Sequence, residues 1–308
     1  MDPLVLIVSL SIPYIVYTSV ALGNALVERS GVLNLSIDGL FVLGVAIAYT
    51  LNVVLSLWLG SGAIFIAIVA TAMIVSLVGI MRTYLVSALP IPQGALGLSI
   101  MFLCYGLAAL IGNLGLSMFS SAAPEQRLRI GYITATPNAS IAFYTIAITI
   151  AVAVNLLINR TKLGVMIRAS GDDPRVVSYM GANLVKVRLV SSAIGDFLVG
   201  LGSAIYTLCW VTGWKQDYGL NHGWLAYAIS VAGGRSPILV AILSIPFSSL
   251  YYAFSHLQAL GVPVDIAKLM PYAAAIAATV TYSITPIGRK WRDPKYLGRE
   301  FYREERAM

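Results

Sequence analysis

Residues 28–40 read ERSGVLNLSIDGL, and this stretch decides the fold. An acid and a base stand near Gly31, and the apolar sequence that follows carries a second acid, Asp38. Charged groups are costly inside a bilayer, and those that occur there usually face a cavity or another polar group. The stretch therefore predicts a membrane helix that is interrupted beside a transport path.

The composition of the whole chain agrees with a membrane location. The 308 residues are 58% hydrophobic and only 11% charged, with a mean hydropathy of +0.84. Soluble domains carry about a quarter charged residues. Helix breakers, 27 Gly and 13 Pro, are scattered through apolar sequence, which membrane helices tolerate where neighbours or cavity water satisfy the backbone. We expect an all-α, polytopic integral protein of the cell membrane.

Apolar runs of sufficient length give the number of membrane crossings. A membrane helix needs about 20 mostly apolar residues, and the runs that qualify are 4–26, 34–57, 61–81, 94–118, 139–159, 189–211, 236–258 and 270–287. A shorter run at 222–233 is a short helix or half of a broken one, and 83–93 is a loop or a re-entrant turn. The sequence predicts eight to ten transmembrane helices, with nine preferred. The first run is a retained helix, because its N-terminus lacks the positive charge of a signal peptide.

Basic residues predict which end of the bundle faces the cytoplasm. Thirteen of the 20 Lys and Arg residues lie in two regions, 160–188 and 289–308. Cytoplasmic loops concentrate positive charge in this way, so the net charge of +7 does not indicate nucleic-acid binding. We expect a transmembrane permease domain over 1–288, a basic cytoplasmic tail over 289–308, and an N-terminus outside. Four tryptophans would then lie at the outer interface: Trp58, Trp210, Trp214 and Trp224.

The basic mid-chain region contains the signals of one short helix, in GDDPRVVSYMG at 171–181. Asp173 suits the N-cap, Pro174 the first helical position and Gly181 the end, while Asp172 adds negative charge at the positive end of the helix dipole. Several side chains between the caps are apolar: Val176, Val177, Tyr179 and Met180. The segment is either a docking element for a soluble partner or a loop helix that lies on the membrane surface.

Two stretches resemble the signatures of a known family. ERSGVLNLSIDGLFVLGVA at 28–46 and GVMIRASGDDPRVVSYMG at 164–181 are similar to those of permease subunits of ATP-binding cassette (ABC) importers for branched-chain amino acids, simple sugars and nucleosides. VAGGRSP at 231–237 resembles a later turn of the same family. The chain departs from the pattern at Val176–Val177, where alanines are usual, and at Ala182.

The resemblance implies a type II ABC importer fold with a coupling helix at about 172–181. That helix would sit in a cleft of an ATPase subunit. The residues expected to engage the ATPase are Arg168, Gly171, Asp172, Asp173, Pro174, Val177, Met180 and Gly181. The chain has no G-x-x-x-x-G-K-[ST] phosphate loop, so it is expected to be a transport subunit and not an enzyme, without a cofactor of its own.

The expected partners follow from the same resemblance. They are two ABC ATPase subunits that bind ATP and Mg²⁺, a second permease subunit, identical or homologous, and an extracytoplasmic solute-binding protein that meets the outer loops 119–138 and 212–222. Membrane lipid surrounds the assembly. The solute indicated by the ERSGVLNL form is a nucleoside, with a simple sugar or a branched-chain amino acid as alternatives.

Polar residues of the opening stretch are candidates for the solute path. Asn34, Ser36 and Asp38 either line the path or mark a helix break, and Asp38 alternatively caps a restarting helix. Asp196 lies among small residues that predict tight helix packing; it pairs with a base or lines the path. Glu28 and Arg29, at the inner end of the first helix, either pair or reach lipid headgroups.

An ion-coupled secondary transporter is the alternative of a different class, with Asp38 and Asp196 as ion sites. The two histidines, His222 and His256, are isolated in the sequence and do not indicate a metal site. Cys104 and Cys209 fall in apolar runs and are expected to be buried thiols.

Overall fold

The computed structural model describes residues 3–259, 261, 273–274, 276–281, 284–285 and 293–299. Within these ranges every regular element is helical. In chain order the elements are α1 (Pro3–Arg29), α2 (Ile37–Leu59), the 3₁₀-helix η1 (Gly60–Gly62), α3 (Ala63–Ala88), α4 (Gln93–Ser121), α5 (Pro124–Arg127), α6 (Pro137–Arg160), α7 (Lys162–Asp172), α8 (Pro174–Tyr179), α9 (Leu184–Ile205), the π-helix η2 (Tyr206–Val211), α10 (His222–Ala232) and α11 (Pro237–Ala259).

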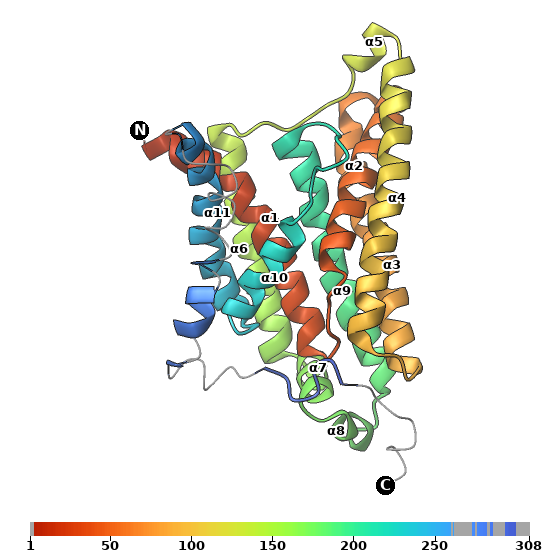
Figure 1. Cartoon of the computed structure of the whole chain (residues 1–308), viewed down its shortest axis with the longest axis vertical. Helices are drawn as coiled ribbons and strands as arrows, with labels where there is room; N and C mark the ends of the chain where they lie inside the picture. The colour runs from red at the N-terminus through yellow and green to blue at the C-terminus, as the bar shows by residue number, and fades with distance from the viewer. Residues whose placement is uncertain are drawn as a thin grey trace.

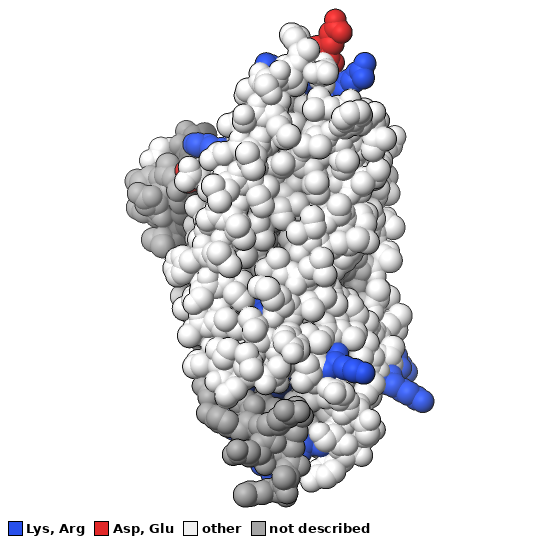
Figure 2. All heavy atoms as spheres, turned by 90° about the vertical axis from the view of Figure 1, so that its right-hand side faces the viewer, with Lys and Arg blue, Asp and Glu red and all other residues white. Residues whose placement is uncertain are grey.

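The long helices run between two ends of an elongated bundle. α7 and α8 lie at one end, which we call the inner end, and α5 lies at the other, the outer end (Figure 1). The face that carries α3 and α4 has its charged side chains near the two ends, with a broad, almost uncharged band between them (Figure 2). This distribution matches the segregation that a bilayer imposes on charged residues.

Five continuous segments of the described chain are long and apolar enough to cross a membrane. One of them, Ile37–Ala88, contains both α2 and α3, which lie side by side. Of the predicted helix 270–287 the structure describes only residues 273–274, 276–281 and 284–285, and of the tail 289–308 only residues 293–299; the side chain of His256 also lies outside the described residues. The total of nine crossings therefore stays a prediction.

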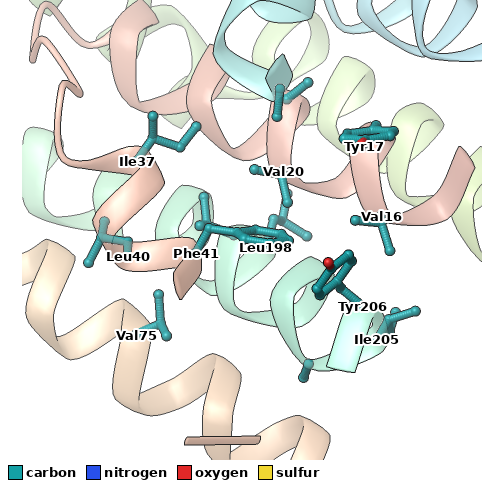
Figure 3. Packing of buried hydrophobic residues seen from close by; sticks show 14 of the residues in the cluster. Val16, Tyr17, Val20, Ile37, Leu40, Phe41, Val75, Leu198, Ile205 and Tyr206 are labelled. Carbon is teal, nitrogen blue, oxygen red and sulfur yellow. The ribbon is translucent and has the colours of Figure 1, made fainter. Parts of the chain in front are cut away.

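The core is built around α1, in which every residue from Ser11 to Arg29 is buried. Side chains of α1, α2, α3 and α9 interdigitate there, as the labelled residues from Val16 to Tyr206 show (Figure 3). α1 and α9 cross with their backbones in contact, because a Cβ added to Gly23 would lie 2.3 Å from the Gly195 carbonyl oxygen. Small residues permit such close approach between membrane helices.

Two central helices are each followed by a non-helical segment and a new helix that begins inside the bundle (Figure 1). Residues 30–36 separate α1 from α2, and residues 212–221 separate η2 from α10. Gly31 (φ 85°) and Gly219 (φ 90°) adopt positive φ angles that favour glycine. The predicted interruption in the opening stretch is confirmed, and the short run at 222–233 forms the helix α10.

Three expectations about the elements need correction. Of the ambiguous stretch 83–93, predicted as a loop or a re-entrant turn, only residues 89–92 form a loop, because α3 continues to Ala88 and α4 begins at Gln93. The mid-chain region contains α7 in addition to the one predicted helix. Trp224 is not at the outer interface, because α10 begins inside the bundle and the Trp224 amide donates to Asp38.

Candidate functional site

Asp38 joins the two points at which helices restart inside the bundle. Its Oδ1 accepts hydrogen bonds from the amides of Gly223 (2.8 Å) and Trp224 (3.2 Å). Its Oδ2 accepts from the Asn221 amide (3.2 Å) and the Tyr105 hydroxyl (2.5 Å). A carboxylate in this position accepts from the first N–H groups of α10, which have no acceptor within the helix, and its negative charge complements the helix dipole. Asp38, in the first turn of α2, therefore acts as the N-terminal cap of α10.

A glycine in the first turn of α10, Gly223, lets the backbone of α10 contact the backbone of α2. A Cβ added to Gly223 would lie 2.4 Å from the Asp38 Cα, so only glycine fits at this position. Both Asp38 carboxylate oxygens are engaged by protein groups, and the side chain is buried. A solute could bind this carboxylate only by replacing contacts that hold α10 in place.

A buried arginine gathers the other predicted path residues at a second place. Arg82 of α3 donates to Asn34 Oδ1 and, at 2.9 Å, to Ser36 Oγ in the segment after α1. It also pairs with Asp196 of α9, with 3.0 Å between Arg82 Nη2 and Asp196 Oδ2. Ser192 donates to the same carboxylate oxygen at 2.5 Å. Asn34, Ser36 and Asp196 are thus brought together, whereas Asp38 bonds to α4 and α10.

Sequence reasoning missed Arg82 as a member of this site. The signal that could have identified it is a basic residue within apolar sequence, since Asp196 is an acid within a second apolar stretch. A base and an acid at such depth are expected to pair. The pair fixes the non-helical segment 30–36 against α3 and α9.

Aromatic rings surround His222, the first residue of α10, and we call these residues the His222 cluster. The ring centroids of Tyr17, Phe41, Tyr206 and Trp210 lie 4.6–5.9 Å from that of His222. The Tyr17 hydroxyl and His222 Nδ1 are 2.8 Å apart. Tyr206 and Trp210 belong to η2, and π-helical turns frequently occur at functional sites. The cluster packs the start of α10 against α1, α2 and η2.

A network of charged residues closes the inner end of α1. Arg235, between α10 and α11, pairs with Glu28 at 2.5 Å and also with Asp293. Arg29 donates to the carbonyl oxygens of Gly234 (2.6 Å) and Arg235 (3.2 Å). Glu28 is fully buried. Of the two roles expected for Glu28, the structure shows pairing within the protein.

Residues 293–299 form a segment that we call the tail clasp. The Tyr296 amide donates to the Gly171 carbonyl at 2.8 Å, and the Gly298 amide donates to the Gly31 carbonyl at 3.4 Å. Gln93, the first residue of α4, donates to the Arg299 carbonyl at 2.8 Å. The clasp therefore connects the end of α7, the turn after α1 and the start of α4.

The predicted coupling segment lies at the inner end and begins its short helix as the sequence indicates. Asp173 Oδ1 accepts from the Arg175 amide at 3.0 Å, and Gly181 has φ +73°. Of the residues expected to engage the ATPase, Gly171, Pro174 and Val177 are buried; Arg168 and Asp173 are half-buried; Asp172, Met180 and Gly181 are exposed.

Apolar side chains of α8 and the residue after it project from the inner end. Tyr179 is 83% exposed and Met180 is 52% exposed, while Val177 is buried against the core. An exposed cluster of large apolar groups beside a firmly anchored residue suits a protein–protein contact.

The chain is similar to known permeases over most of its length. Residues 6–284 match the family model described as branched-chain amino acid transport system / permease component. The guanosine ABC transporter permease protein NupQ of Bacillus subtilis is 25% identical over 231 residues, covering 71% of this chain and 72% of the relative. The nucleoside ABC transporter permease protein NupC of Lactococcus lactis is 22% identical over 302 residues, covering 92% and 93%.

A further relative differs in its solute. The putative glucose ABC transporter permease protein TsgC13 of Haloferax volcanii is 25% identical over 253 residues, covering 79% of this chain and 75% of the relative. No solved structure matches the chain. The match of the family model to nearly the whole chain, together with its apolar helices, shows that the chain is a multi-pass membrane protein of the branched-chain amino acid transport system permease family.

Proposed function

We propose that this chain is the permease subunit of an ATP-driven ABC importer that moves a nucleoside inward by alternating access. The observation that carries the proposal is the junction at Asp38, where two interrupted helices meet inside the bundle. Helices interrupted near the middle of a transporter offer helix ends and free backbone groups to a polar solute. Relatives named for guanosine and for nucleosides support this class of solute.

The coupling surface is the apolar group formed by Val176, Tyr179 and Met180. An ABC ATPase subunit would receive these side chains in a cleft, and the ATPase would bind ATP and Mg²⁺. Movement of α8 would pass to α7, and from Gly171 to the tail clasp and the turn at Gly31, through the hydrogen bonds described above. Two such ATPase subunits would serve a pair of permease subunits.

The remaining partners would contact other parts of the chain. A second permease subunit, identical or homologous, would complete the path. A solute-binding protein would dock on the loops at the outer end, which include α5 and residues 212–221. Arg127 and Arg129 lie in the first of these loops and offer positive charge there.

Reconstitution in liposomes tests the proposed function. The chain, its ATPase and its binding protein are expected to take up guanosine when ATP is present on the cytoplasmic side, and to take up glucose and leucine much more slowly. Replacing residues 172–181 by a Gly-Ser linker should abolish stimulation of ATP hydrolysis by the loaded binding protein. The same type of linker in place of residues 89–92, the loop between α3 and α4 that is assigned to no partner, is the matched control and should preserve it.

The alternative class of transporter gives a different result in the same vesicles. Solute uptake by this chain alone, driven by an ion gradient and independent of ATP, would contradict the proposal. ATP-driven uptake of leucine or glucose without nucleoside uptake would contradict the assignment of the solute but not of the ATP-driven mechanism.

A further inference from the structure

Four aromatic residues of α4 and α10 form a surface beside the Asp38 junction, which we call the aromatic strip: Phe102, Tyr105, Trp224 and Tyr227. The Phe102 and Tyr105 rings are 6.1 Å apart, and the Trp224 and Tyr227 rings are 5.9 Å apart, each pair edge to face. Tyr105 and Trp224 both donate to Asp38, through the Tyr105 hydroxyl and the Trp224 amide, which brings the two pairs to the same junction. Phe102 is 65% exposed, and the other three are half-buried.

The polar group of Tyr105 in the strip points toward the protein. It donates to Asp38 Oδ2 at 2.5 Å. This bond fixes the orientation of the Tyr105 ring, and the neighbouring Phe102 ring is 65% exposed. A rigid ring has little conformational entropy to lose when a ligand stacks on it.

The depth of the strip argues against a lipid-facing role. Tyr and Trp side chains in lipid prefer the membrane–water interfaces. Trp224 instead lies at the junction inside the bundle, and Tyr227 follows one turn later toward the inner end. The strip therefore extends from the point where the helices restart toward the cytoplasmic end.

The charges beside the strip favour a neutral ligand. Asp38 is engaged by four donors, and Glu28 is paired with Arg235. The His222 cluster is less suited to contact a solute, because its rings are largely buried against one another. A neutral ligand with a flat aromatic face fits the strip better than a charged amino acid does.

We propose that the aromatic strip is the stacking surface for the heterocyclic base of the transported solute and determines selectivity for nucleosides over sugars. This inference rests on the proposed function and deepens it by assigning the specificity residues. An aromatic ring can stack on any nucleoside base, because every base has a π-face. The larger purine ring should gain more from the strip than a pyrimidine ring.

Transport kinetics of the complete complex in liposomes test this assignment. Replacing Trp224 by Leu should lower kcat/KM for guanosine uptake roughly 5- to 140-fold, the range that corresponds to one base–aromatic stack. Trp224→Phe keeps a ring and should recover most of the loss. The guanosine-to-uridine ratio of kcat/KM should fall toward one in Trp224→Leu but not in Trp224→Phe. Phe65→Leu, at a ring that is 65% exposed on α3, is the matched control and should leave transport unchanged.

Phe102→Leu provides a second test that does not depend on the packing of Trp224, because the Phe102 ring is mostly exposed. It should also lower guanosine uptake and the guanosine-to-uridine ratio. If the original complex transports guanosine but Trp224→Leu and Phe102→Leu retain its rate and its selectivity, the strip is not the stacking surface. Equal losses for guanosine and uridine would likewise overturn the assignment. If the original complex shows no ATP-driven nucleoside uptake, the proposed function itself fails.

Discussion

Replacing Asp196 by Asn tests how strongly the buried Arg82 depends on one carboxylate. The two side chains are 1% and 0% exposed and lie 3.0 Å apart. Asn preserves the shape and retains an oxygen that accepts from Ser192, but it removes the negative charge. A buried charge that loses its partner costs about 3–5 kcal/mol. We therefore expect the free energy of unfolding to fall by about 3–5 kcal/mol.

The measurement is reversible unfolding of the chain in mixed detergent micelles. Ser76→Ala is the matched control on the same pair of helices, because Ser76 donates one neutral hydrogen bond to the Ala193 carbonyl at 2.8 Å. That substitution should cost about 1 kcal/mol. The double variant Arg82→Met/Asp196→Leu removes both charges and should be more stable than Asp196→Asn. If Asp196→Asn cost no more than the control, the pair would not stabilise the segment 30–36.

Three further predictions concern close contacts and caps. Gly195→Val should lower the thermal midpoint of the chain, because its Cβ would lie 2.6 Å from the Gly23 carbonyl oxygen, whereas a substitution that left the midpoint unchanged would contradict the α1–α9 crossing. Gly223→Ala should slow guanosine uptake by displacing α10 from Asp38, and unchanged uptake would show that this contact is dispensable. Asp173→Ala should remove a cap worth about 1 kcal/mol and weaken the stimulation of ATP hydrolysis, measured in the reconstituted complex.

Local signals in the sequence account for the features that were predicted correctly. The break after α1 follows from polar residues and glycine in apolar sequence, and the start of α8 follows from the cap Asp173 and from Pro174. The burial of Cys104 and Cys209 follows from their apolar neighbours. Each of these properties depends on residues within one or two turns of the position concerned.

Contacts between distant segments could not be predicted in the same way. Asp38 caps a helix that begins 184 residues later, at His222, and no local pattern shows which acid meets which helix. Arg82 meets Asn34 and Asp196 only after three segments have packed. The position of Trp224 was wrong for a related reason, since a helix that starts inside the bundle has the same composition as one that starts at its surface.

The tail clasp has a consequence for biogenesis. Residues 293–299 leave the ribosome after all the elements that they tie together: the end of α7, the turn at Gly31 and the start of α4. Until these residues are made, the carbonyl oxygens of Gly171 and Gly31 lack the donors that the clasp supplies. The inner end of the bundle is therefore completed only in chains translated through Arg299.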